Sequence, residues 1–235
     1  MGCLCEDLLN KGGEKSSRCI GNLWVFANLD PEELIAIAKS ALRKKFNRGE
    51  AVFMQGDSGG GVSLIKCGRI KLSKLMQDGS EITLDIRKAG DFLGENMLSE
   101  ESDYPVSAWC MEEVLICSFS RERFEKLVLD YPKIGLQVIR NLSSRITSLT
   151  SRIGSMSLSN LEERLYRVLM NVALEHGIKN SQGFTIQFPL THEDLSFLTG
   201  AHRVSITRAM KSLKESGKII QQGRDLTLPF EAEWI

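Results

Sequence analysis

The chain has 235 residues, of which 42% are hydrophobic and 26% charged, and its formal net charge is zero. This length allows two domains of modest size, and the composition is that of a globular protein rather than of a disordered or fibrous one. Charged residues interrupt every apolar stretch before the roughly 18 residues that a membrane span requires. We therefore expect a cytoplasmic protein without a membrane partner.

Residues 1–22 contain Cys3, Cys5 and Cys19 and show no hydrophobic period, so we interpret them as a tail or a sensor loop. Asp30, Pro31 and the two glutamates that follow are typical of the first turn of a helix. We expect this helix to continue to about residue 42.

Short runs of alternating hydrophobicity, separated by glycine, occupy the stretch from Arg43 to Ser120. Asp78-Gly79 lies between two such runs and is a strong signal for a hairpin turn. Many short strands at this spacing indicate a β-barrel or jelly roll. The strands are expected at residues 51–55, 61–67, 69–77, 80–87, 92–94, 106–111 and 114–119.

A long helix is expected from about Pro132 to Met156. Its apolar residues alternate in spacings of three and four, with isoleucine at one seam position and leucine or methionine at the other, a combination that favours a parallel two-stranded coiled coil. A helix that lies on the barrel would also show an apolar stripe. We expect the stripe to join two copies of the chain, and it consists of Ile139, Leu142, Ile146, Leu149, Ile153 and Met156.

The C-terminal part has the pattern of a winged helix-turn-helix. Thr191 is a suitable N-cap for a short helix, Gly200 supplies the turn, and a second, longer helix follows. A β-hairpin that turns at Gly223 corresponds to the wing. Between Gly200 and Arg224 there are six basic residues and a single acid, which is the local positive charge that a DNA-contacting module needs.

The second of these helices is expected to enter the major groove of double-stranded DNA. Arginine can donate two hydrogen bonds to guanine, so we assign Arg208 to base readout, and we place Val204 at the boundary of the helix's buried face. On an ordinary surface helix these charges would only be solvated, and it is their combination with the helix pair and the wing that favours DNA. The expected contacts are Arg203, Val204, Ser205, Thr207, Arg208 and Lys211.

Two short motifs, GDFLGE at residues 90–95 and Ser-Ala-Trp at residues 107–109, occur together with the barrel, the long helix and the winged helix-turn-helix. In this combination the chain resembles the cyclic-AMP receptor protein and fumarate-nitrate-reduction regulator (CRP/FNR) superfamily from about Phe26 to Leu228. The resemblance implies a homodimeric transcription regulator, not an enzyme, that binds a palindromic promoter site and has RNA polymerase as a further partner.

The fold class implied is α+β, with an N-terminal cyclic-nucleotide-binding-like double-stranded β-helix (jelly roll), a long dimerisation helix and a C-terminal winged helix-turn-helix. The expected domains are a cysteine-containing tail (1–22), a sensor barrel (23–131), the dimerisation helix (132–157) and the DNA-binding domain (158–235).

Cyclic-nucleotide members of the superfamily place an arginine directly before the Ser-Ala pair to hold the phosphate, whereas this chain has Val106 there, preceded by Pro105. Without that cation the phosphate would enter the barrel unpaired, which is costly. Glu95 of the motif is present but is insufficient, so cyclic AMP is not expected as a cofactor.

The fumarate-nitrate-reduction branch holds an iron-sulfur cluster with N-terminal cysteines and one barrel cysteine. The resemblance suggests that Cys3, Cys5, Cys19 and Cys117 are ligands of a 4Fe–4S cluster and that the protein senses redox state, oxygen or nitric oxide. The N-terminal spacing departs from the compact cysteine run of that branch. A thiol–disulfide switch and purely structural cysteines therefore stay open as alternatives.

A small organic effector in the barrel, such as a chlorinated aromatic compound, is a second candidate signal. Apolar side chains on the strands could line a cavity, and a basic residue could neutralise a carboxylate or phenolate, although most of these side chains are expected to fill the core. The candidate pocket consists of Lys66, Arg69, Leu84, Glu95 and Trp109.

A barrel metalloenzyme is a candidate from a different class. All three histidines, His176, His192 and His202, lie outside the predicted strands, so the barrel lacks the ligands of a metal-dependent oxygenase. A haem would have to use Cys67 or Cys110 as an axial thiolate.

The segment from Gly200 to Arg208 has Val204 where the main branch of the superfamily has a glutamate, and it is similar to the halorespiration regulators, which respond to chlorinated phenols. Valine can contact a thymine methyl group, whereas glutamate accepts a hydrogen bond from cytosine. The expected operator is an A/T-rich inverted repeat with half-sites about one helical turn apart.

Overall fold

The computed structural model describes residues 29–98, 103–156 and 160–230. They form two compact units. The first comprises the described residues up to Glu81 together with Asp85–Arg145, and the second comprises Ile82–Leu84 together with the described residues from Ile146 onward. The predicted tail, with its three cysteines, lies outside the described residues.

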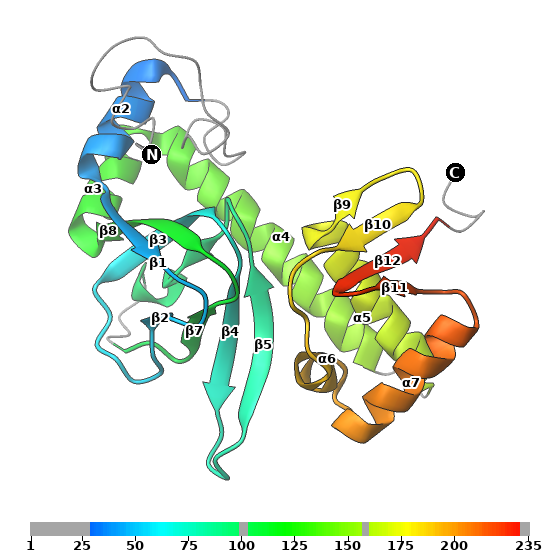
Figure 1. The fold of residues 1–235 in the computed structure, drawn as a ribbon. Helices are drawn as coiled ribbons and strands as arrows, with labels where there is room; N and C mark the ends of the chain where they lie inside the picture. The colour runs from blue at the N-terminus through cyan, green and yellow to red at the C-terminus, as the bar shows by residue number, and fades with distance from the viewer. Residues whose placement is uncertain (1–28, 99–102, 157–159, 231–235) are drawn as a thin grey trace. The chain divides into compact units, whose positions relative to one another are not determined.

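Two four-stranded sheets make up the barrel of the first unit (Figure 1). One sheet has the strand order β1-β8-β3-β6 and the other the order β2-β7-β4-β5. The Asp78-Gly79 turn joins β4 to β5 as the sequence predicts, and Gly79 has a φ of +83° there. The strands are β1 (Leu42–Phe46), β2 (Ala51–Phe53), β3 (Gly61–Cys67), β4 (Ile70–Leu75), β5 (Glu81–Arg87), β6 (Phe92–Leu93), β7 (Ser107–Cys110) and β8 (Val114–Ser120).

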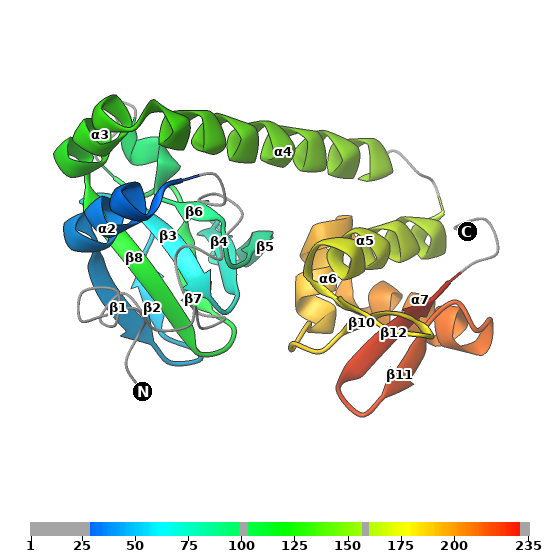
Figure 2. The same cartoon turned by 90° about the horizontal axis from the view of Figure 1, so that it is seen from above.

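The two faces of the β1-β8-β3-β6 sheet serve two different hydrophobic cores. On β8, Cys117 and Phe119 belong to an outer cluster that also includes residues of α2 (Pro31–Ser40), α3 (Arg121–Asp130) and α4 (Pro132–Met156). The views in Figures 1 and 2 place α2 and α3 beside this sheet. Val114 and Ile116 point the other way, into an inner cluster shared with β4 and β7. This alternation is the period of two expected for a strand that is covered on both sides.

The first helix ends earlier than the sequence pattern suggests. It stops at Ser40, and Leu42–Phe46 forms β1, which pairs with β8 in the register Leu42↔Ser118. Three consecutive basic residues of β1 hide its alternation from a sequence pattern. Charged side chains of this kind are common on edge strands, because they discourage pairing with other chains.

The second unit combines helices with a small sheet of order β11-β12-β10-β9. Its core contains Leu165 and Leu169 of α5, Leu195 of α6, and Ile206 and Leu213 of α7, all of them buried. The elements are α5 (Leu161–His176), β9 (Ile178–Lys179), β10 (Gly183–Ile186), α6 (His192–Thr199), α7 (Arg203–Glu215), β11 (Ile220–Gln222) and β12 (Asp225–Pro229).

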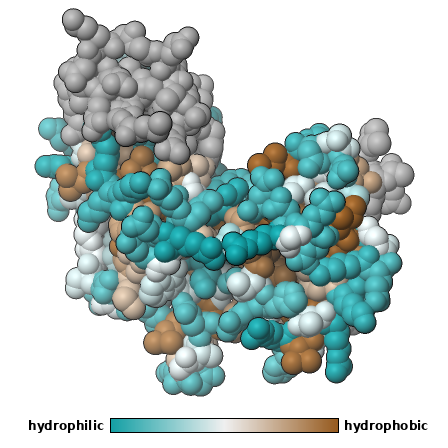
Figure 3. Space-filling model, viewed as in Figure 1, coloured by the Kyte–Doolittle hydropathy of each residue, from teal (hydrophilic) through white to brown (hydrophobic). Residues whose placement is uncertain are grey.

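On the face of the molecule shown in Figure 3, hydrophobic residues form small separate groups among hydrophilic ones. Among the described ranges, no helix combines the length and the apolarity needed to cross a bilayer.

Candidate nucleic-acid interface and sensor site

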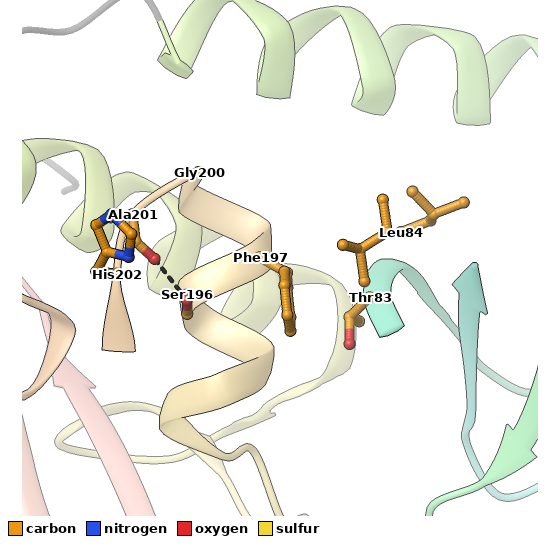
Figure 4. A pocket seen from close by; sticks show the side chains of 8 residues that line it. Thr83, Leu84, Ser196, Phe197, Gly200, Ala201 and His202 are labelled. Atoms are coloured by element: carbon orange, nitrogen blue, oxygen red, sulfur yellow. Dashed lines mark hydrogen bonds between the residues drawn. The ribbon is translucent and has the colours of Figure 1, made fainter. Parts of the chain in front are cut away.

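Local hydrogen bonds fix the turn between α6 and α7. At the start of α6 the Thr191 hydroxyl accepts from the Asp194 amide at 3.0 Å, and the Asp194 carboxylate accepts from the Thr191 amide at 3.0 Å, which is a capping box. At its end Gly200 adopts a left-handed conformation, φ +66° and ψ +36°. The Ser196 hydroxyl then donates to the carbonyl of Ala201 (Figure 4). These contacts define where α7 begins.

Helix α7 has one buried and one exposed face, and the exposed face carries nearly all the expected DNA contacts. Ser205 is half-buried, whereas Val204 is 66% exposed, so it lies outside the small core rather than at its boundary. The exposed residues are Arg203, Val204, Thr207, Arg208 and Lys211, and the buried ones are Ile206, Ala209, Met210 and Leu213.

The charges on this face are largely unpaired among the residues that the structure describes. Lys211 lies 3.7 Å from Glu215, but both side chains are well exposed, and a pair of this kind contributes little. Within the described residues the guanidinium groups of Arg203 and Arg208 have no ion pair. Their donors are therefore available to an external acceptor.

His192 is a residue of this surface that the sequence analysis considered only as an absent metal ligand. Its Nδ1 atom lies 3.1 Å from the Thr207 hydroxyl of α7. Burial, followed by the charges of Lys214 and Arg203, lowers the pKa of His192 below 6.5. The signal that could have identified it is its position directly after the N-cap Thr191, on the helix that precedes the recognition helix.

The predicted wing is present as the hairpin of β11 and β12, which pair in the register Gln222↔Asp225. Gly223 has a φ of +61° in the turn, a conformation that favours glycine. Arg224 is exposed at the tip, so one more cation lies on the second unit's surface.

The apolar stripe of α4 divides between two environments. Ile139, Ile146 and Ile153 are 59%, 65% and 70% exposed, and Leu149 is also exposed. Leu142 instead packs partly against the outer cluster of the barrel. The side chain of Met156 lies outside the described residues. Four of the six expected seam residues thus form an exposed apolar stripe within the described part of the chain.

In the first unit, two arginines and three carboxylates form one connected group. Arg87 pairs with Asp85 and with Glu95, each at 2.9 Å. Arg145 of α4 pairs with Asp91 and lies 3.6 Å from Asp85. Arg87, Asp91 and Arg145 are all buried. Glu95 of the GDFLGE motif is therefore held by the chain's own arginine, and the group contains one carboxylate more than guanidinium groups.

The residues expected to form an effector pocket are spread over different elements. Lys66 is buried on β3, Arg69 pairs with Glu112 at 2.8 Å, and Leu84 is a half-buried residue of β5. Glu95 binds Arg87, and Trp109 is a half-buried residue of β7. None of the five lines the cavity of about 360 Å³ that the structure shows in the barrel.

Of the described cysteines, Cys110 and Cys117 are buried and Cys67 is half-buried. Cys117 is fully buried in the outer cluster, and burial, with a smaller effect from Glu50, raises the pKa of Cys110 to about 11. No group of three or more His, Cys, Asp or Glu residues suited to a metal ion occurs in the described ranges. Of the four expected cluster ligands the structure describes only Cys117, so the cluster stays a prediction.

Fold and surface together define a class of protein, a transcription regulator with a sensor barrel and a Crp-like DNA-binding domain. The model of the cyclic nucleotide-binding domain matches residues 43–131, and the model of the Crp-like helix-turn-helix domain matches residues 163–231. The chain belongs to the CRP/FNR family of transcription regulators.

Known regulators are similar over most of their length. The CRP-like cAMP-activated global transcriptional regulator of Mycobacterium tuberculosis is 24% identical over 204 residues, which cover 87% of this chain and 91% of that protein. The anaerobic regulatory protein of Bacillus subtilis is 28% identical over 192 residues, 78% and 81% of the two chains. The structure of the c-di-GMP responsive global regulator CLP of Xanthomonas campestris has a TM-score of 0.73 at 22% identity, covering 86% of this chain and all of that one, and shows the shared fold.

Proposed function

We propose that the protein is a homodimeric regulator, not an enzyme, that inserts α7 into the major groove at each half of an inverted DNA repeat. The observation that carries this proposal is the exposed face of α7, where Arg203 and Arg208 have no ion pair within the described residues. Exposed guanidinium groups can donate two hydrogen bonds at once to the oxygens of a phosphate or to the acceptor atoms of guanine.

The residues of this face have different roles in the proposal. Arg208 reads a base edge, and Arg203, Ser205, Thr207 and Lys211 contact phosphates and bases. Val204, exposed beside them, contacts a thymine methyl group. The preferred operator is therefore A/T-rich, with half-sites about one helical turn apart.

Selection of binding sites from a random DNA pool tests this assignment. We expect an A/T-rich inverted repeat to be enriched, and an R208A variant to lose discrimination at one base pair per half-site. Enrichment of half-sites with G/C centres, or unchanged selectivity of R208A, would contradict the assigned roles.

A second copy of this chain is the proposed partner for the exposed stripe of α4. Ile139, Ile146 and Ile153 recur at every seventh position, which keeps them on one face of a supercoiled helix. Isoleucines exposed in this pattern are buried when two such helices pair. Dimerisation also brings two recognition helices to one operator, as an inverted repeat requires.

The proposed signal is redox state, which the cysteines of the tail would sense together with Cys117. The tail leads into α2, and α2 and Cys117 contribute to the same outer cluster. Anaerobic purification with iron and sulfide assays tests this proposal. Iron-free protein with the same DNA affinity before and after air exposure would contradict it.

An organic effector in the barrel is the second candidate signal. It is favoured by a specific observation, the cavity of about 360 Å³ in the first unit. Sites for small molecules in proteins usually have volumes of about 300 to 1,000 Å³.

A further inference from the structure

The barrel cavity lies at one end of the first sheet's inner face. We call it the serine-lined pocket, because Ser63 and Ser118 are among the residues that line it. On this face β8 presents Val114, Ile116 and Ser118, which mark a change from apolar to small polar side chains. Val114 and Ile116 belong to the inner core, and both Ile116 and Ser118 line the pocket. The pocket thus borders the inner core at Ile116 and opens to the surface beside the exposed Leu42 and Lys44.

Strand register brings the small residues together. Ser63 of β3 lies opposite Ser118, and Gly61 lies opposite Ser120. The hydroxyls of Ser63 and Ser118 are hydrogen-bonded at 2.8 Å. Valine or leucine at these positions would occupy part of the volume that the small serine side chains leave open. Each hydroxyl can donate one hydrogen bond and also accept, which leaves capacity for a ligand.

Another part of the lining is apolar and aromatic. The rings of Phe53 and Tyr104 are stacked, with centroids 3.8 Å apart and planes inclined by 8°. Phe46 of β1 and Val52 of β2 complete this apolar wall. The Tyr104 hydroxyl lies 3.5 Å from the Gly61 carbonyl and also bonds to the backbone of Gly60, and burial raises the pKa of Tyr104. The phenol therefore stays protonated and can donate to a ligand.

The charges that line the pocket balance each other. Lys44 of β1 is exposed and has no ion pair within the described residues. Asp57 lies on the adjoining loop and accepts from the Met54 amide at 2.8 Å. One cation and one anion give no net preference for a charged ligand. The serine hydroxyls can form hydrogen bonds with a ligand, and the apolar wall can pack against an aromatic ring. A neutral molecule that carries a hydroxyl group and an aromatic ring therefore fits best.

We propose that the serine-lined pocket binds a small, uncharged, hydroxyl-bearing aromatic molecule, of which phenol is the simplest. The ring lies against the wall of Phe46, Val52 and Phe53, and its hydroxyl group bonds to Ser63 or Ser118. As an effector site this inference rests on the proposed regulatory function, but it places the ligand away from Lys66, Arg69 and Trp109.

Titration of the full-length protein with phenol, followed by the methyl resonances of labelled isoleucines, tests the pocket. Ile116 lines the pocket and its signal is expected to shift saturably. Ile134 lies in the outer cluster and serves as the internal control, expected to stay fixed. Benzoate has the same ring with a negative charge and is expected to bind at least tenfold more weakly than phenol. No saturable shift of Ile116, or equal binding of benzoate, would overturn the proposal.

Two variants of about equal side-chain volume distinguish the loss of pocket volume from the loss of a hydrogen bond to the ligand. S118T keeps the hydroxyl and S118V replaces it by a methyl group, so phenol is expected to bind about three- to tenfold more weakly to S118V than to S118T. S118L fills the pocket and is expected to abolish the Ile116 shift. Equal affinity of S118T and S118V, or an unchanged shift in S118L, would overturn the assigned site.

Operator binding measured on the same samples keeps the two proposals distinct. Phenol binding without operator binding would overturn the proposed function and leave the pocket intact. Operator binding without phenol binding would overturn the pocket alone.

Discussion

The arginines of the first unit and those of α7 differ in burial and in ion pairing. Arg87 and Arg145 are buried and paired with carboxylates of their own unit. Arg203 and Arg208 are exposed and have no ion pair within the described residues. The isoleucines of α4 differ in the same way, since Ile134 is buried in the barrel's outer cluster and Ile146 is exposed. We propose that groups left without a partner among the described residues mark the surfaces where a second molecule binds.

The largest effect is expected from a charge in the exposed stripe of α4. In I146K the dimer no longer buries the two Ile146 side chains. Burial of each contributes about 1.5 to 3 kcal/mol to the free energy of dimerisation. The dissociation constant of the dimer should therefore rise by at least about a hundredfold, as measured by analytical ultracentrifugation. S144K changes an exposed position outside the stripe and should leave the dimer intact. Equal behaviour of the two variants would show that the stripe is not the dimer seam.

A smaller effect is expected when the buried group of the barrel loses one cation. R145A leaves Asp91 buried without its arginine, which should lower the free energy of unfolding by about 3 to 5 kcal/mol. The matched control is R140A on the same helix, where the side chain is exposed and the change should stay within about 0.5 kcal/mol. Urea denaturation compares them, and similar stabilities would refute the contrast between buried and exposed arginines.

The effect of His192 on stability is expected to be modest and dependent on pH. Because burial and two nearby cations lower its pKa below 6.5 in the folded chain, the unfolded chain binds more protons at mildly acidic pH. Stability contributed by neutral His192 is thus lost as the pH falls through about 6.5 to the lower folded pKa. Urea denaturation of H192Q should show a smaller loss over this range, and an unchanged pH dependence would speak against the assigned environment.

At the small end of the scale, we expect no response to cyclic AMP. The arginines of the barrel group are already paired, and Val106 stands where the family's nucleotide-binding members have a cation. Isothermal titration calorimetry with cyclic AMP should show no binding in the micromolar range. A micromolar dissociation constant would mean that the internal ion pairs open for a ligand.

Local patterns were sufficient to predict most of the fold. The Asp78-Gly79 hairpin, the continuous helix from Pro132 to Met156 and the glycine turn between α6 and α7 all have signals contained in a few neighbouring residues. Strand β1 was missed because Arg43, Lys44 and Lys45 interrupt the hydrophobic alternation, and its pairing with β8 is distant in sequence.

The candidate sites were harder to predict wherever their partners are far apart in the chain. Arg145 meets Asp91 across 54 positions, and Ser63 meets Ser118 across 55, so no sequence window contains either pair. The exposed face of α7 could be predicted because a single helix period determines it. The expected effector residues did not gather at the cavity, because hydrophobicity and charge alone do not specify strand register.

Fluorescence anisotropy with the selected inverted repeat tests the central claim most directly. The wild-type protein should bind as two chains per site, R203A and R208A should each lose about 1 to 3 kcal/mol of binding free energy, and both should unfold like the wild type. K126A, which removes an exposed cation from the barrel unit, should bind like the wild type. Operator affinity that is unchanged in R203A and R208A would contradict the assignment of the α7 face as the DNA-binding surface.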